Sequence, residues 1–91
     1  MLEDQPFQCP CCDYYSLSER GVYLICPVCY WEDDGQNMDQ LDEVSVPNHI
    51  TLRKARENFK AIGASDQSAL SLVASQGDRA GLRREQRATY F

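Results

Sequence analysis

Long hydrophobic runs are missing from this chain of 91 residues. No apolar stretch approaches the roughly 18 residues that a membrane-spanning helix needs, so we expect no membrane insertion. The N-terminal segment MLEDQPFQC lacks the apolar core of a secretory signal, which predicts a cytoplasmic protein. The chain is also short. We expect a single domain, residues 1–91, whose small core needs a metal or disulfides to stabilise it.

Residues that usually carry catalysis are scarce. His49 is the single histidine, and we interpret it as a polar residue near a helix start rather than a metal ligand or an acid–base group. The sequence shows no combination of a nucleophile, a partnered base and an oxyanion stabiliser. We therefore expect a protein without enzymatic activity, although the acidic residues keep an enzyme open as a third hypothesis.

Basic residues are nearly absent from the first half of the chain. Residues 1–45 contain ten acids and one base, Arg20, whereas residues 46–91 contain four acids and eight bases. The two halves therefore carry −9 and +4, which gives the net charge of −5. This asymmetry has two interpretations: an acidic face that attracts a basic partner, or two halves that neutralise each other across the fold.

Five cysteines are present, an odd number that argues against a framework of disulfides. Four of them form two C-P-x-C units, Cys9 to Cys12 and Cys26 to Cys29. Each unit places two sulfurs close enough to share one metal ion, and four thiolates suit a tetrahedral zinc site. Such a site has no open coordination position. The sequence therefore predicts one structural Zn²⁺ per chain, bound by Cys9, Cys12, Cys26 and Cys29.

The same cysteines have two alternative uses, an iron–sulfur centre and a dithiol redox site. An iron–sulfur centre takes the same ligands, and the sequence does not exclude it. A dithiol redox site is typical of a βαβ context, which the sequence lacks. The fifth cysteine, Cys11, lies inside the first unit, and we interpret it as a small packed residue rather than a reactive thiol.

The predicted fold is a small α+β domain that begins with a zinc-ribbon-like β-hairpin over residues 7–32. Residues 14–17 and 22–25 are rich in aromatic and branched side chains, and the turn signal at residues 18–21 between them predicts that they pair. Residues 30–32 predict a third short strand. Trp31 is predicted to be the centre of the core beside the two zinc knuckles.

Two helices and a basic tail are predicted to follow in residues 51–91. Apolar residues recur with helical spacing over residues 52–62, with Thr51 as N-cap and Gly63 as C-terminal stop. The apolar face consists of Leu52, Ala55, Phe59 and Ile62. A second helix is predicted from Asp66 to Gly77. Residues 78–91 form a basic, weakly helical tail that either frays or docks through Tyr90 and Phe91.

Residues 33–50 have no periodicity and are predicted to form a long acidic loop. Three interpretations apply to its acids: turn formation around Asp33 and Asp34, a weakly supported hard-cation site with Asn37 and Asp39, or a contact surface for a basic protein. The candidate partner-binding residues are Glu32, Asp33, Asp34, Asp39, Asp42 and Glu43.

Three stretches resemble the bacterial cysteine-rich CPCC family: CPCCDYYSL, GVYLICPVCYWEDDGQ and SVPNHITLRKARENFKAIGAS. The resemblance covers about residues 7–66 and implies a small, zinc-ribbon-like protein with the four ligands named above and no catalytic residue. This sequence departs from the family at Asp13, where Gly is common. It also departs at Lys54, which stands where a Glu would form a capping box together with Thr51. The tail after Ser75 does not follow the family pattern.

The function predicted from these features is a zinc-binding protein-interaction module. Some relatives belong to toxin–immunity systems, so its most concrete form is an immunity protein that neutralises a basic, nuclease-type toxin domain. The alternative is a zinc-ribbon protein that contacts nucleic acid through its basic C-terminal half. The sequence pI of about 4.6 weighs against that alternative.

Overall fold

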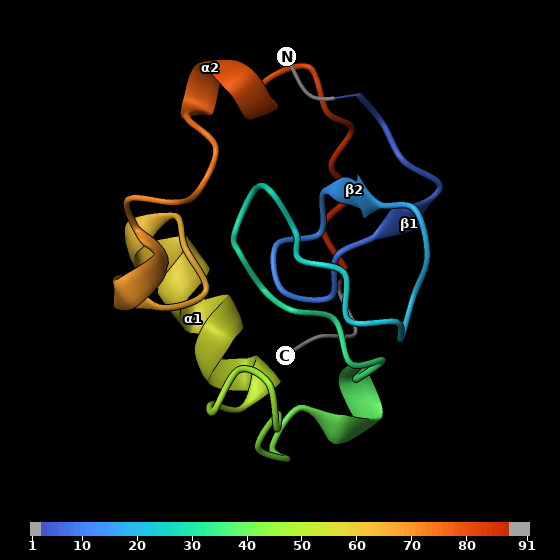
Figure 1. Ribbon diagram of the computed structural model, residues 1–91, viewed down its shortest axis with the longest axis vertical. Coiled ribbons are helices and arrows are strands. Elements are labelled where there is room, and N and C mark those ends of the chain that lie inside the picture. The colour runs from blue at the N-terminus through green and yellow to red at the C-terminus, as the bar shows by residue number, and fades with distance from the viewer. Residues whose placement is uncertain (1–2, 88–91) are drawn as a thin grey trace.

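The computed structural model describes residues 3–87, in which the regular elements are few and short. In chain order they are β1 (Phe7–Gln8), β2 (Tyr15–Leu17), the 3-10 helix η1 (Met38–Gln40), α1 (Leu52–Ile62), the 3-10 helix η2 (Gln67–Ala69) and α2 (Gln76–Arg79). Figure 1 shows the two strands on one side of the molecule and α1 on the other, with irregular segments between them. The fold is therefore a small α+β fold, as predicted. Within residues 3–87 no helix is long and apolar enough to cross a membrane.

Each cysteine turn lies between two segments that pair with each other. β1 and β2 pair in antiparallel fashion on either side of the first turn. Around the second turn, Ile25 and Glu32 form an antiparallel bridge. The backbone N–H of Tyr23 donates to the carbonyl of Asp33 at 2.9 Å and extends that pairing. The sheet itself has two strands, β1 and β2.

The predicted hairpin between residues 14–17 and 22–25 is wrong. Each run pairs across its nearest cysteine turn, because that turn reverses the chain directly and brings the closest segments together. Residues 18–21 instead connect the two pairs. Gly21 has φ of 74° and donates its N–H to the Asp33 carboxylate at 2.9 Å, a left-handed conformation that glycine adopts without strain. The predicted third strand at 30–32 is limited to the single bridge at Glu32.

The predicted helix over residues 52–62 is confirmed as α1, including both of its ends. The Thr51 hydroxyl accepts a hydrogen bond from the N–H of Lys54 at 3.1 Å. Gly63 adopts φ of 79° and donates its N–H to the carbonyl of Phe59. Leu52 and Ala55 are fully buried. This helix therefore begins and ends where its caps predict.

The last turn of α1 is less buried than predicted. Ile62 is 41% exposed, so its assignment to the core is wrong. Phe59 is partly buried and packs edge-on against the ring of Tyr14, with centroids 6.3 Å apart. The fully buried residues of α1 are therefore confined to its first turn.

The predicted helix from Asp66 to Gly77 is also wrong. It is replaced by η2 and α2, and Gly77 lies inside α2 rather than after it. Within this segment, Ala74 donates its N–H to the carbonyl of Pro27 at 2.9 Å, and Ser65, just before the segment, donates to the carbonyl of Cys29 at 2.8 Å. A continuous helix would use the N–H of Ala74 internally, so contact with the second cysteine turn interrupts it.

The hydrophobic core surrounds the cysteine turns. Trp31 is fully buried at its centre, as predicted. Its largest fully buried apolar neighbours are Leu17, Val28 and Leu52. Since the four cysteines are themselves part of this cluster, the core and the candidate metal site form one unit.

The C-terminal tail docks along β2 as far as it is described. Arg84 forms an antiparallel bridge with Tyr14, and the N–H of Tyr15 donates to the carbonyl of Arg83 at 2.9 Å. Leu82 is only 7% exposed. The tail therefore docks through this short extended segment, which the sequence did not predict. Tyr90 and Phe91, the predicted docking residues, lie outside the described residues.

Candidate metal centre

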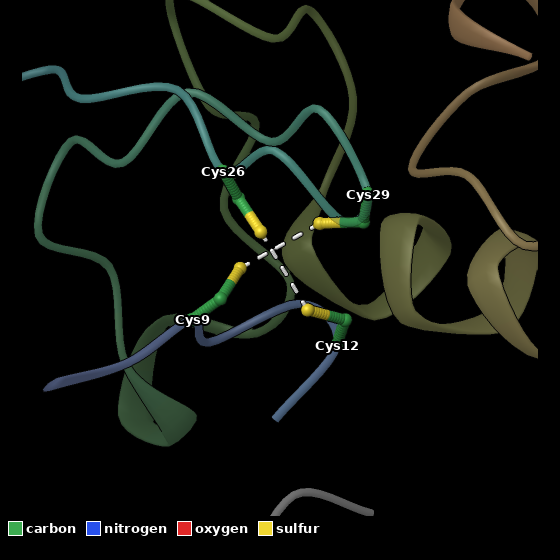
Figure 2. A group of neighbouring side chains, drawn as sticks. All are labelled: Cys9, Cys12, Cys26 and Cys29. Atoms are coloured by element: carbon green, nitrogen blue, oxygen red, sulfur yellow. Dashed lines mark hydrogen bonds between the residues drawn. The ribbon is translucent and has the colours of Figure 1, made fainter. Parts of the chain in front are cut away.

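Four cysteine sulfurs converge on one point between the two turns (Figure 2). All four lie within 4.8 Å of one another. The sulfurs of Cys9 and Cys29 are 3.6 Å apart, and those of Cys12 and Cys26 are 3.7 Å apart. The structure therefore brings together the four residues that the spacing predicts, and all four are buried.

The sulfur positions fit a single tetrahedral ion. With metal–sulfur bonds of about 2.3 Å, tetrahedral geometry separates neighbouring sulfurs by about 3.8 Å. The two separations of 3.6 and 3.7 Å agree with that value, and the other pairs of sulfurs lie within 4.8 Å. Four thiolates complete the coordination shell, so the residues fit a closed structural site.

The two cysteine turns share one backbone conformation. Asp13 and Tyr30, which follow the second cysteine of each turn, have φ of 68° and 69°. Their N–H groups donate to the carbonyls of Cys9 and Cys26 at 2.9 and 2.8 Å. In both turns the first cysteine also donates its N–H to the carbonyl five residues later. The matching bonds show that each C-P-x-C unit folds as the same local structure.

Arginines cover the first turn. Arg56 of α1, together with Arg84 and Arg87 of the tail, donates hydrogen bonds to carbonyl oxygens within residues 9–12 at 2.6, 3.1 and 3.4 Å. Arg56 and Arg84 bond to the carbonyls of Pro10 and Cys12, whereas Arg87 adds a second hydrogen bond to the carbonyl of Cys9, which already accepts the N–H of Asp13. These guanidinium groups also place positive charge beside a site that would carry −2 if four thiolates held a divalent cation.

Asp13 fixes two of these arginines. Its carboxylate accepts hydrogen bonds from both terminal nitrogens of Arg56 at 2.8 and 2.9 Å, and Arg87 lies 3.4 Å away. Asp13 is 1% exposed. An aspartate tolerates the left-handed conformation at this position better than most residues do. In the sequence, Asp13 was identified only as a departure from the Gly that is common in the family. The signal that could have indicated its role is an acid directly after CPCC in a chain whose tail is rich in arginine.

Backbone groups cover the second turn instead. As described above, Ser65 and Ala74 donate N–H groups to the carbonyls of Cys29 and Pro27. The hydroxyl of Ser16 lies 3.0 Å from the sulfur of Cys26. A hydroxyl that donates to a thiolate stabilises its negative charge and orients the ligand. The first turn thus depends on side chains of α1 and the tail, and the second depends on the segment after α1.

The surroundings act differently on the four thiols. Burial raises the pKa of Cys9, Cys12 and Cys29 because it disfavours the charged thiolate. Burial also acts upward on Cys26, but hydrogen bonds from Cys12, Cys29, Cys9 and Ser16 hold its pKa well below the ordinary value. A divalent cation among the sulfurs supplies the positive charge that lets all four ionise.

Cys11 and His49 lie outside the four-sulfur group. Cys11 is 2% exposed and packs in the core cluster, which agrees with its interpretation as a small packed residue. His49 is exposed and donates its backbone N–H to the carbonyl of Ser45 at 2.7 Å. Among residues 3–87, the four cysteines are the one group of His, Cys, Asp or Glu side chains placed to hold a metal ion.

Asp33 cannot belong to an exposed acidic surface. It is 0% exposed, and its carboxylate accepts hydrogen bonds from Arg20, Gly21 and Gly35 at 2.7, 2.9 and 3.3 Å. These bonds fix the bend at residues 18–21 against the chain that follows Trp31. For Asp33, the turn-forming interpretation is the one that the structure supports.

The other acids of the loop differ in their exposure. Asp34 is partly buried and accepts hydrogen bonds from the N–H of Gln36 and the hydroxyl of Ser45. Asp42 is exposed and pairs with Arg53 at 2.7 Å, and this arginine holds the pKa of Asp42 below its ordinary value. Glu32 is half-buried, and Asp39 and Glu43 are exposed. Because Asp33 and Asp34 accept backbone hydrogen bonds within the turn, the remaining candidates for a contact surface are Glu32, Asp39, Asp42 and Glu43.

Comparison with known proteins agrees with the cysteine pattern. Neither the curated proteins nor the solved structures gave a match. A model of the family described as "Cysteine-rich CPCC" matches residues 7–79. The match extends beyond residue 66, where the resemblance in the sequence ends, and stops before the docked tail. The chain belongs to the cysteine-rich CPCC family.

Proposed function

We propose that this chain is a non-enzymatic binding module whose fold is organised by one structural Zn²⁺. The observation that supports the proposal is the cluster of four buried sulfurs within 4.8 Å of one another, which are enough ligands to fill the coordination shell of one tetrahedral ion and leave no position for a substrate. Metal binding in such a site stabilises the fold rather than performs chemistry. The function then depends on the surface that the metal holds in place.

Zinc is the ion that we propose for this site. All four sulfurs lie within 4.8 Å of one another, which suits one ion. A cluster of several irons would move thiolates on different irons further apart. Four thiolates without an open position are also the usual ligand set of structural zinc. Elemental analysis of the purified protein tests this, with one zinc per chain expected and iron as the contradicting result.

We further propose that the four surface acids Glu32, Asp39, Asp42 and Glu43, here called the acidic surface, contact a basic protein. The loop that carries them is held in place: the Gln36 amide donates to the carbonyls of Gln40 and Glu43 at 3.0 and 2.9 Å. A fixed loop loses little entropy on binding, and its charge speeds encounter with a basic partner. A nuclease-type toxin domain is such a partner, which gives an immunity-type role.

The test is co-expression with the protein encoded beside this chain in its genome, followed by binding measurements at two ionic strengths. A basic protein that forms a one-to-one complex is the expected result. Asp39→Lys combined with Glu43→Lys should slow association, most strongly at low salt, because screening weakens charge attraction beyond about 8 Å at physiological ionic strength. Glu3→Lys combined with Asp78→Lys changes the net charge equally at other exposed positions, and it should have a much smaller effect.

Recovery of RNA instead of a protein would contradict this proposal and support the nucleic-acid alternative. Arg84 and Arg87 are unsuitable for testing that alternative, because both donate to carbonyls of the first cysteine turn. Lys54 and Arg83 are exposed and are the better positions. If their replacement releases bound RNA while the fold and the metal persist, the binding module acts on nucleic acid.

A further inference from the structure

A basic surface pocket lies beside the first cysteine turn, between α1 and the docked tail. Its volume is about 240 Å³, and Cys11 and Phe59 form its least polar part. Cationic side chains from two segments far apart in the sequence line it. These are Arg53, Arg56 and Lys60 of α1 and Arg84 of the tail.

Positive charge exceeds negative charge in this pocket. Glu57 is its one acidic lining residue, against four cationic residues. Two of the cations are paired with acids that do not line the pocket, Arg53 with Asp42 and Arg56 with Asp13. Lys60 and Arg84 have no carboxylate within 4.0 Å among residues 3–87, so an excess of positive charge remains.

The two arginines nearest the cysteine turn are already fixed. Arg56 makes two hydrogen bonds to Asp13 and a third to the carbonyl of Pro10 at 2.6 Å. Arg84 donates its Nε to the carbonyl of Cys12 at 3.1 Å, and its guanidinium lies 5.7 Å from the centre of the Tyr14 ring. Because these side chains are held before a ligand arrives, binding costs them little conformational entropy.

We propose that this pocket binds a phosphate group, carried by free inorganic phosphate or by a small phosphomonoester. Phosphate is a multiply charged anion with several acceptor oxygens, and guanidinium and ammonium groups are its usual partners in proteins. The weakly polar floor formed by Cys11 and Phe59 reduces screening by water and strengthens each charged contact. A volume of about 240 Å³ admits a group of this size rather than a nucleic-acid duplex.

The test is calorimetric titration of the metal-loaded full chain, in phosphate-free buffer, with inorganic phosphate and with AMP. Lys60→Gln removes a pocket cation whose side chain is exposed and outside the core. It should weaken binding of a phosphate probe about tenfold, or about 1.4 kcal/mol, because it removes one ammonium group that can donate to a charged oxygen. Lys54→Gln is the matched control: it lies on the same helix, is exposed and does not line the pocket. This variant should keep the affinity of the wild type.

The two probes and a third ligand distinguish the outcomes. Binding of inorganic phosphate with no gain for AMP indicates free phosphate as the ligand, and tighter binding of AMP indicates a phosphomonoester. Equal losses of phosphate affinity in Lys60→Gln and Lys54→Gln would overturn the proposal, because they would indicate general attraction to the positive charge of α1 rather than binding in the pocket. Binding of a 20-nucleotide oligouridylate without measurable binding of either small probe would overturn it as well.

Discussion

Asp13 and Asp42 each pair with an arginine of α1, yet their surroundings are opposite. Asp13 is 1% exposed and lies against Arg56, whereas the Asp42 side chain is 75% exposed beside Arg53. A buried charge pair that loses one partner leaves an uncompensated charge in a medium of low polarity. An exposed pair that loses one partner is solvated by water.

We expect Asp13→Asn to lower the free energy of unfolding by about 3 kcal/mol. Asparagine keeps the size of the side chain and tolerates the left-handed backbone, so the change isolates the charge. Asp42→Asn, the control, should cause a much smaller loss, because water solvates the charge that remains on Arg53. Urea unfolding at a fixed free zinc concentration measures both. Equal losses for the two variants would show that burial of the Asp13 pair is not what stabilises the first turn.

Cys26 and Cys11 should respond in opposite ways to replacement by serine. Cys26→Ser should lose the metal and most of the fold, because metal binding in small sites of this kind supplies about 10–16 kcal/mol of folding free energy. Cys11→Ser should retain one metal ion per chain, since Cys11 lies outside the four-sulfur group. Elemental analysis with circular dichroism reports both properties. Metal loss in Cys11→Ser combined with metal retention in Cys9→Ser would show that the ligand assignment is wrong.

At the scale of single residues, the sequence predicted the ligands but not the residues that hold them. Cys9, Cys12, Cys26 and Cys29 follow from local spacing, because each C-P-x-C unit brings its own two sulfurs together. The pairing of Asp13 with Arg56 spans 43 residues and depends on where α1 lies against the first turn. The burial of Asp33 likewise depends on a bend that a linear pattern of acids does not reveal.

At the scale of elements, prediction succeeded where one segment determines its own structure. The periodicity and caps of α1 are local, and its bounds were predicted correctly. The segment from Asp66 to Gly77 also has apolar residues, but its backbone bonds to the second cysteine turn and its helix is broken. The docking of the tail was missed because residues 80–87 carry little periodicity and one buried apolar residue, Leu82.

Leu82 offers a direct measure of how much the tail contributes. Leu82→Ala should lower the free energy of unfolding by about 2–3 kcal/mol, since it removes a side chain that is 93% buried by its neighbours. Leu72→Ala removes the same atoms from a position that is 56% exposed, and it should change stability by no more than about 0.5 kcal/mol. Thermal unfolding of both variants provides the comparison. Equal stability of the two variants would show that the docked tail is dispensable.

At the scale of the whole molecule, the acidic and basic halves of the chain meet. The ion pairs Arg56–Asp13, Arg87–Asp13 and Arg53–Asp42 each join a base of the second half to an acid of the first. The interpretation that the halves neutralise each other therefore holds for these residues. Asp39 and Glu43 stay exposed outside these pairs, so the acidic surface remains a proposal.

Metal binding should release protons, and its affinity should fall as the pH falls. Burial raises the pKa of Cys9, Cys12 and Cys29, so these thiols hold their protons at neutral pH until a cation displaces them. Lower pH favours the protonated thiols and thus opposes binding. Zinc titration calorimetry in two buffers of different ionisation enthalpy measures the protons released. If the affinity for zinc stayed the same over about two pH units, from about pH 6 to about pH 8, this result would contradict binding by thiolates.

The order of ligands and covering residues along the chain has a consequence for biosynthesis. All four ligands occur by residue 29, whereas the groups that cover the two turns come from residues 56–87. A ribosome therefore releases the complete ligand set while the coverings are still being translated. We expect that a metal ion can bind to these cysteines before α1 and the tail pack over the two turns. In the finished protein these late segments cover both turns, so we expect the lifetime of a bound metal ion to depend on residues that never touch it.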